Sequence, residues 1–225
     1  MRFVLLLLLA LPARAETVTV AVASNFQTTF EELAEIWEAR TGHEVRVSAG
    51  ATGLLYAQIV RGAPFDLFLA ADADRPARLE ADGLGRGRRA YALGRLALWG
   101  RGGADEAALG APIDTLAIAN PETAPYGGAA REIIEARGIE VGTLLTGENA
   151  AQALLFARTG NAALAFVPLA FTLDDPRAWP VPADWHAPIR QELIVLSDGP
   201  AAALADWLTG PEARALIEAR GYALP

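Results

Sequence analysis

Four short segments of the sequence combine hydroxyl, amide or glycine residues at places where a strand pattern gives way to a helix pattern. They are Ser24-Asn25, the Gly-Ala-Thr-Gly run at 50–53, Pro125-Tyr126-Gly127 and Gly147-Glu148-Asn149. The first N–H groups of a helix have no acceptor inside the helix, and the helix dipole makes that end positive. Several such helix ends together favour the binding of an anion.

The donors in these segments are uncharged, because none of the four contains an arginine and the sequence has no lysine. A cage of neutral donors suits a fully ionised dianion, which accepts many hydrogen bonds and donates none. Burying such an ion is costly unless each oxygen is paired. Charge-assisted hydrogen bonds of roughly 1.5–3 kcal/mol each can offset that cost. Selectivity would follow from the size of the cage and from the lack of an acceptor for a protonated ligand.

Each of these residues also has a purely structural explanation. Ser24, Thr52 and Asn149 could be helix N-caps, the commonest role of such side chains at a helix start. Gly127 could allow a tight turn, and Tyr126 could pack in the core with its hydroxyl paired. The predicted anion site therefore depends on the coincidence of several segments, and no single segment specifies it.

The elements between these segments follow the pattern of an α/β fold with mixed, mostly parallel sheets. For example, Phe26, Phe30, Leu33 and Trp37 form one apolar helix face, and Gly42 ends that helix. Ligands of open α/β sheets collect at the carboxyl ends of the strands, where the four segments lie. The patterns predict strands at 18–23, 45–47, 65–71, 95–99, 116–119, 163–167 and 192–196, and further helices at 54–61, 73–81, 127–137, 148–158, 201–208 and 211–220.

The first fifteen residues are typical of a secretory signal peptide. Arg2 precedes an apolar run at 3–11, and Ala13-Arg14-Ala15 gives the small-x-small cleavage pattern. The apolar run is far shorter than the roughly 20 residues of a membrane-spanning helix. We therefore expect residues 1–15 to be removed and the mature protein to be periplasmic.

We expect the mature chain to form two lobes. One lobe is expected at 16–94 and 197–225, and the second, crossover strands included, at 95–196.

Composition excludes several classes of function. The chain of 225 residues has a formal net charge of −8, which disfavours nucleic-acid binding, because phosphate attraction needs a concentrated basic surface. The sequence has no cysteine, which excludes disulfides, thiolate metal sites and cysteine nucleophiles. The lack of lysine excludes a P-loop lysine and Schiff-base chemistry.

At the four strand-to-helix segments and at several segments between them, the sequence resembles the molybdate-binding component of ATP-driven importers, which belongs to the type II periplasmic binding proteins. The resemblance covers essentially the whole mature chain in order. It is carried by Ala-Val-Ala-Ser-Asn-Phe at 21–26, Gly-Ala-Thr-Gly at 50–53, Gly-Ala-Pro-Phe-Asp-Leu-Phe at 62–68, Ala-Ile-Ala-Asn-Pro at 117–121, Thr-Ala-Pro-Tyr-Gly at 123–127, Thr-Gly-Glu-Asn at 146–149 and Gly-Asn-Ala at 160–162.

This resemblance implies two α/β lobes that close over molybdate or tungstate in the cleft between them. It implies a monomer that delivers the ion to the membrane permease of an ABC importer, without a cofactor and without direct cation ligands. By motif position, Ser24 and Asn25 would supply hydroxyl and backbone or amide donors, and Thr52 a hydroxyl and an N–H. Tyr126 and Ala150 would supply backbone N–H groups from the second lobe.

Three positions depart from the family pattern. Thr52 stands where many members have serine, and Ala150 stands where a larger aliphatic residue is usual. Pro168 occupies a position that holds a ligand-contacting tyrosine in one branch, and proline has neither an N–H nor a hydroxyl.

Three alternatives to a molybdate binder remain open on the sequence. An enzyme is one alternative, for which the only histidines are His43 and His186, and the chain contains neither a Gly-x-Ser-x-Gly nor a His-Glu-x-x-His motif. A cation binder would need clustered ligands, for which Asp66 and Asp72 are the nearest candidates. A binder of sulfate, thiosulfate or phosphate would hold a different oxyanion by the same mechanism, a cage of uncharged donors between two lobes. Protonated phosphate would need an acceptor, for which the four segments offer Glu148 at most, and sulfate is smaller than molybdate.

Overall fold

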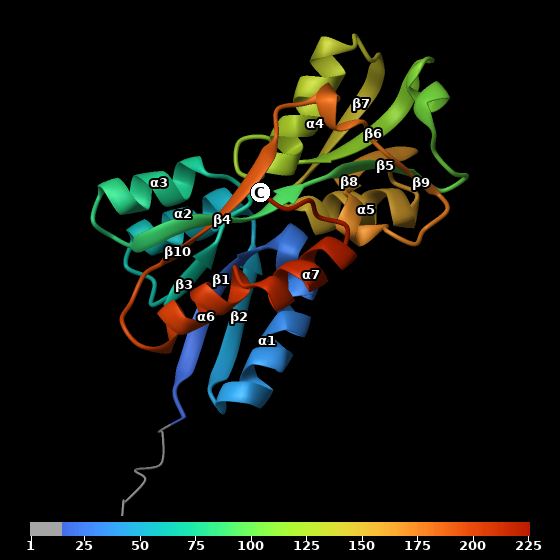
Figure 1. The fold of residues 1–225 in the computed structure, drawn as a ribbon. Helices are drawn as coiled ribbons and strands as arrows, with labels where there is room; N and C mark the ends of the chain where they lie inside the picture. Colours follow the sequence, from blue (N-terminus) through green and yellow to red (C-terminus); the bar gives the residue numbers. More distant parts are fainter. Residues whose placement is uncertain (1–14) are drawn as a thin grey trace, which may run out of the picture.

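Two five-stranded sheets, each covered by helices on both faces, make up the part of the chain that the computed structural model describes, residues 15–225 (Figure 1). The predicted signal peptide lies outside the described residues, apart from Ala15. Within residues 15–225, no helix has the length and apolar character needed to cross a membrane.

The first sheet has the order β2-β1-β3-β10-β4, in which β1 runs parallel to β2 and β3 while β10 runs antiparallel to β3 and β4. Alternate residues of β1 face opposite layers: Val20 and Val22 pack against α1, α6 and α7, whereas Ala21 packs against α2 and α3. The elements are β1 (Thr17–Ala23), α1 (Gln27–Thr41), β2 (Glu44–Gly50), α2 (Thr52–Val60), β3 (Leu67–Leu69), α3 (Asp74–Ala81), β4 (Arg86–Gly94), β10 (Ile189–Val195), α6 (Pro200–Leu208) and α7 (Pro211–Ala219).

The second sheet has the order β7-β6-β8-β5-β9, with β6 parallel to β7 and β8, and β5 antiparallel to β8 and β9. Leu116 and Ile118 of β6 pack against α4, and Ala117 packs against α5 on the other face. The elements are β5 (Leu96–Gly100), β6 (Ile113–Ala119), α4 (Pro125–Ala136), β7 (Val141–Gly147), α5 (Ala150–Thr159), β8 (Leu164–Pro168) and β9 (Ala178–Pro180), with short 3-10 turns η1 (Ser24–Phe26), η2 (Glu106–Leu109), η3 (Leu169–Phe171) and η4 (Ala183–Trp185).

The two lobes are joined where β4 and β10 run side by side. Only Arg95 separates the end of β4 in the first sheet from the start of β5 in the second, and β10 brings the chain back. The C-terminal segment returns to this junction, because Leu93 and Ala223 exchange two backbone hydrogen bonds of 2.7 and 2.9 Å (Figure 1). The predicted α/β fold with two lobes is confirmed.

Three strands were not predicted from the sequence, β4, β7 and β9. All three lie at the edge of a sheet, where one side of the strand has no partner strand. The segment at 86–94 is rich in arginine and glycine, and most of 141–147 is exposed. Strands with so little buried surface lack the apolar pattern that indicates a strand in a sequence.

Candidate functional site

The four segments singled out in the sequence each follow a parallel strand, namely β1, β2, β6 and β7. In the first lobe Ala23 lies beside Gly50, and in the second lobe Ala119 lies beside Gly147. The carboxyl ends of parallel neighbours meet at one edge of a sheet. Each lobe therefore presents two adjacent strand-to-helix junctions.

These two edges face each other across the lobe interface. The N–H of Gly53 donates to the carbonyl of Thr123 at 2.8 Å, and η1 contacts α5. Ala23 and Ala71 of the first lobe belong to the same buried cluster as Tyr126 of the second. The structure thus brings the four junctions together. Asn25 of the first lobe and Asn149 of the second line one pocket of about 660 Å³, and Pro125 lines another of about 270 Å³.

Thr52 is the first residue of α2 and is 1 % exposed. Ala51 is the N-cap, so the N-cap interpretation of Thr52 is wrong. The Thr52 Oγ1 accepts a hydrogen bond from the Ala71 N–H at 3.2 Å. A hydroxyl has one hydrogen to donate and two lone pairs, so accepting from Ala71 leaves the hydrogen available to another acceptor. Its backbone N–H also has no acceptor within the helix.

Ser24 and Asn25 form the start of η1, and neither caps α1, whose N-cap is Phe26. Ser24 is half-buried and Asn25 is 4 % exposed. The Asn25 Nδ2 donates to Gln191 Oε1 at 2.9 Å, and the Asn25 carbonyl accepts from the Tyr222 hydroxyl at 2.6 Å. One hydrogen of the Asn25 side-chain amide is thus bonded to the crossover strand, and its second amide hydrogen and its backbone N–H remain as donors at the junction.

Tyr126 is the second residue of α4, after Pro125 at the first position. Its side chain is buried, and its hydroxyl accepts from Gln191 Nε2 at 3.1 Å, so the expectation of a packed tyrosine with a paired hydroxyl is met. Burial raises the pKa of Tyr126 well above the usual value. The backbone N–H of Tyr126 lies in the first turn of α4, where it has no acceptor within the helix, and it is the donor that the resemblance assigns to this residue.

Glycine at 127 is required by the close approach of α4 to β6. A Cβ added at Gly127 would lie 2.1 Å from the carbonyl oxygen of Ala119. No side chain fits in that space, so the glycine keeps the start of α4 against the end of β6.

Ala150 is the first residue of α5 and is 3 % exposed, packed with Ala119 and Ala124. The preceding residue, Asn149, is the N-cap, because its side chain accepts from the Gln152 N–H at 3.1 Å. The N-cap interpretation of Asn149 is confirmed. The cap pairs the N–H of the third helical residue and leaves the Ala150 N–H at the open end of the helix.

Two residues that the sequence did not single out lie at this interface. Gln191 of β10 is fully buried, and its amide joins Asn25 to Tyr126 and lies 3.0 Å from the hydroxyl of Tyr91. A glutamine inside an apolar strand is the signal that identifies it, but the predicted strand began one residue later. Arg75 of α3 donates from Nη2 to the carbonyl of Glu122 at 3.0 Å, across the lobes.

The candidates for catalysis and for cation binding have structural partners. His43 stacks on Trp37 and accepts from the Glu16 N–H, and the Nδ1 of His186 lies 2.7 Å from a backbone carbonyl. Asp66 accepts from Thr19 and Ser197, and Asp72 is paired with Arg75. Within residues 15–225 no group of three or more His, Cys, Asp or Glu side chains could hold a metal ion.

The profile of the family described as bacterial extracellular solute-binding proteins matches residues 18–223. The chain belongs to this family. This solute-binding protein is 43% identical to the molybdate-binding protein ModA of Azotobacter vinelandii, over 96% of this chain and 94% of that protein. It is 38% identical to the molybdate-binding protein ModA of Rhodobacter capsulatus, over 95% of this chain and 91% of that protein.

A solved structure supports the same assignment. The periplasmic molybdate-binding protein of Azotobacter vinelandii superimposes on this solute-binding protein with a TM-score of 0.83 and 33% identity, covering 92% of this chain and 99% of that chain. The resemblance to the periplasmic binding proteins is confirmed. All three relatives are named as binding proteins, which supports a binding protein rather than an enzyme.

Proposed function

We propose that this solute-binding protein captures molybdate, or tungstate, in the periplasm and delivers it to the permease of an ABC importer. The observation that carries the proposal is the convergence of four helix starts from two lobes. The names of the full-length relatives select the ion among those that such a site could bind.

The proposed cage consists of Ser24, Asn25 and Thr52 from the first lobe and Tyr126 and Ala150 from the second. The Thr52 hydroxyl has its donor side open, and the backbone N–H groups of Thr52, Tyr126 and Ala150 lie in the first turn of their helices. Each donor is uncharged, and the helix dipoles add positive potential at the same place. A dianion that donates no hydrogen bond is the matching ligand.

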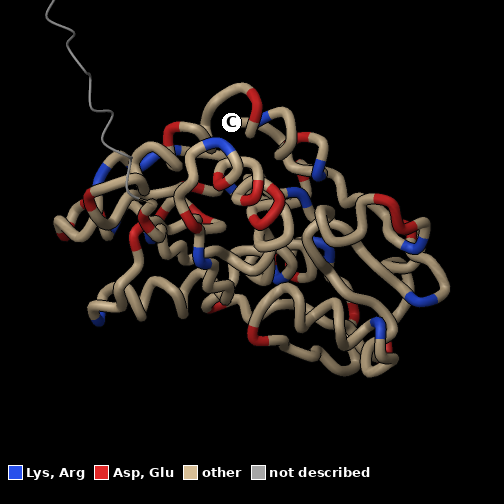
Figure 2. The backbone as a smooth tube through the Cα atoms, turned by 90° about the horizontal axis from the view of Figure 1, so that it is seen from below, with Lys and Arg blue, Asp and Glu red and all other residues tan. Residues whose placement is uncertain are grey.

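The attraction for the ion is local, because the protein as a whole is acidic. The formal net charge is −8, and Figure 2 shows acidic and basic positions interspersed over both lobes. Long-range steering would therefore oppose an anion. Binding must come from the buried donors, where the exclusion of water strengthens each hydrogen bond.

Closure of the lobes is the proposed mechanism. We propose residues 16–94 and 197–225 as one lobe and 95–196, crossover strands included, as the other; of the crossover strands, β10 pairs in the first sheet. The open protein binds the ion on one lobe, and closure adds the donors of the other. The closed state is favoured because its affinity for the ion is higher. We propose that the protein acts as a monomer.

Titration calorimetry of the mature protein tests this proposal, with molybdate, tungstate, sulfate, thiosulfate, phosphate, ferric ion and zinc ion as ligands. The expected result is tight binding of molybdate and tungstate and much weaker binding of the other ions. Tighter binding of sulfate or thiosulfate would replace the proposed ligand by a smaller oxyanion, and a preference for ferric or zinc ion would overturn the cage. No heat and no change of melting temperature with any oxyanion would refute the proposal.

A further inference from the structure

Two hydrogen bonds join the lobes at neighbouring residues of one loop. The Gly53 N–H donates to the Thr123 carbonyl at 2.8 Å, and the Arg75 Nη2 donates to the Glu122 carbonyl at 3.0 Å. Both donors belong to the first lobe, and both acceptors lie in the second-lobe loop that leads into α4. Because each bond crosses the interface, both exist only when the lobes are together.

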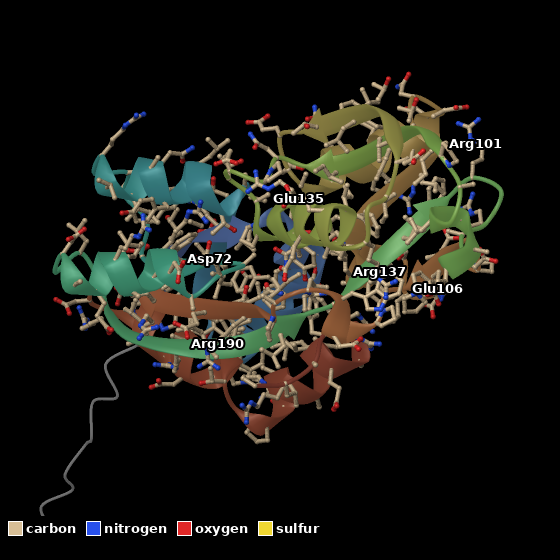
Figure 3. All side chains as sticks on the ribbon, turned by 90° about the horizontal axis from the view of Figure 1, so that it is seen from above. Asp72, Arg101, Glu106, Glu135, Arg137 and Arg190 are labelled. Atoms are coloured by element: carbon tan, nitrogen blue, oxygen red, sulfur yellow. The ribbon has the colours of Figure 1, made fainter. Side chains whose placement is uncertain are left out.

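The guanidinium of Arg75 is held in place by Asp72. The Arg75 N–H donates to Asp72 Oδ1 at 3.1 Å, and Arg75 Nη1 forms an ion pair with Asp72 Oδ2. The two side chains are only 23% and 17% exposed. Figure 3 labels Asp72 at the N-terminal end of α3, on the side that faces the second lobe. Both partners of this pair belong to the first lobe, so the pair does not depend on contact with the second lobe and restricts the guanidinium without it.

Gly53 lets the loop approach α2. A Cβ added at Gly53 would lie 3.0 Å from the Thr123 Cα, 3.2 Å from the Thr123 carbonyl oxygen and 3.0 Å from Arg75 Nη2. Since two of these contacts are with backbone, a side chain at 53 would push the loop away. An alanine at 53 would therefore require the loop to move by a few tenths of an ångström, although the residue lies in an ordinary helical turn.

We propose that Gly53 and Arg75 form a latch on the carbonyls of Glu122 and Thr123, and that this latch sets how long a bound ion stays in the closed protein. The inference rests on the proposed function. Gly53 follows Thr52 directly, and the loop leads to the first turn of α4, so the latch lies beside the proposed donors. Arg75 and Gly53 act by positioning the lobes and do not contact the ion.

The two bonds between the lobes should slow the dissociation of the ion, because they exist only in the closed state. Bonds present only in the closed state lower the population of open protein, and the ion leaves through the open state. Removing them raises the dissociation rate, while the association rate, which reflects capture by the open protein, changes little.

Stopped-flow tryptophan fluorescence with molybdate tests the latch in Arg75→Ala and Gly53→Ala, with Arg78→Ala as the control. Arg78 lies exposed on the same helix, α3, so the control removes the same charge. We expect the dissociation rate to rise about tenfold in Arg75→Ala, because the variant loses one hydrogen bond from a charged group. In Gly53→Ala the rate should rise at least as much. The Arg78→Ala rate should stay within about twofold of wild type.

The association rate and the melting temperature without ligand separate a latch from a general loss of structure. The association rate should match wild type in both variants. Arg75→Ala should lower the melting temperature, because Asp72 loses its ion pair, whereas Gly53→Ala should not, because alanine is the better helix former. If Arg75→Ala folds poorly, Arg75→Lys keeps the charge without the forked donor and should still release the ion faster. Wild-type dissociation rates in Gly53→Ala and either Arg75 variant would overturn the latch while leaving the proposed function intact. A wild-type protein that binds no oxyanion would overturn both.

Discussion

At the scale of single residues, Thr52 combines a structural hydrogen bond with a donor for the ion. Its Oγ1 accepts from the Ala71 N–H, which ties the start of α2 to the end of β3. The same oxygen carries a hydrogen that is left to donate. Serine at this position could make both bonds, and the additional methyl group of threonine is buried with the rest of the side chain.

Replacing Thr52 tests this double role. Thr52→Val keeps the shape but removes the hydroxyl, so we expect molybdate binding to weaken by about 1–3 kcal/mol and the free energy of unfolding to fall by about 1–3 kcal/mol, because the Ala71 N–H is left unpaired. Thr52→Ser is the matched control and should retain both quantities. Calorimetry and urea unfolding measure the two effects. Full affinity in Thr52→Val would show that the hydroxyl does not reach the ion.

The residue types at the site could be predicted from the sequence, but their partners could not. Hydroxyl and amide residues at expected helix starts pointed to Ser24, Asn25 and Thr52. Their hydrogen bonds depend on contacts far apart along the chain, such as Asn25 with Gln191, 166 residues away. No local pattern indicates such a partner, so the sequence alone does not predict the bond between the Asn25 amide and β10.

At the scale of elements, the register of the strands positions the donors. β1 and β2 end together, as do β6 and β7, so the helices that follow each pair start at the same edge of the sheet. Strands rich in buried apolar residues could be predicted, because burial leaves an apolar pattern in the sequence. β7 could not, because it is an exposed edge strand. The start of α5 was predicted two residues early, because Asn149 caps the helix and lies outside it.

Adjacent glycines at the start of α4 give a matched test of how closely this helix must approach β6. Gly127→Ala places a Cβ against the Ala119 carbonyl, so we expect a loss of about 1–3 kcal/mol in the free energy of unfolding, together with weaker binding as α4 moves. A Cβ at Gly128 meets nothing closer than 3.9 Å, so Gly128→Ala should be neutral or slightly stabilising.

Urea unfolding and calorimetry on the two alanine variants measure these differences. Equal stability of the two variants would contradict a need for close contact at 127. A stable Gly127→Ala protein with unchanged affinity would show that the position of α4 does not control the donor of Tyr126.

At the scale of the whole molecule, buried hydroxyls gather where the two lobes, the crossover strands and the C-terminal segment meet. Tyr91 of β4 and Tyr126 of α4 both lie at hydrogen-bond distance from Gln191, and Tyr222 donates to the carbonyl of Asn25. The sequence could not predict this junction, because its members come from five separate segments of the chain. Each of the three tyrosines is 3 % exposed or less.

Alkaline pH should therefore unfold both lobes in a single transition. Burial raises the pKa of Tyr91, Tyr126 and Tyr222, whereas tyrosine in an unfolded chain ionises near pH 10. Below about pH 10 both states keep these protons, so stability is unaffected. Above it only the unfolded chain releases them, and the free energy of unfolding falls by about 1.4 kcal/mol per pH unit for each buried tyrosine until the folded-state pKa is reached.

Tyrosinate absorbance and far-UV circular dichroism, recorded together during an alkaline titration, measure this effect. We expect Tyr91, Tyr126 and Tyr222 to ionise together with the loss of the circular dichroism signal. Protein unfolded in urea is the control and should titrate all four tyrosines near pH 10. Ionisation of three or four tyrosines with the circular dichroism intact would contradict the prediction, because it would mean that water reaches the junction in the folded protein.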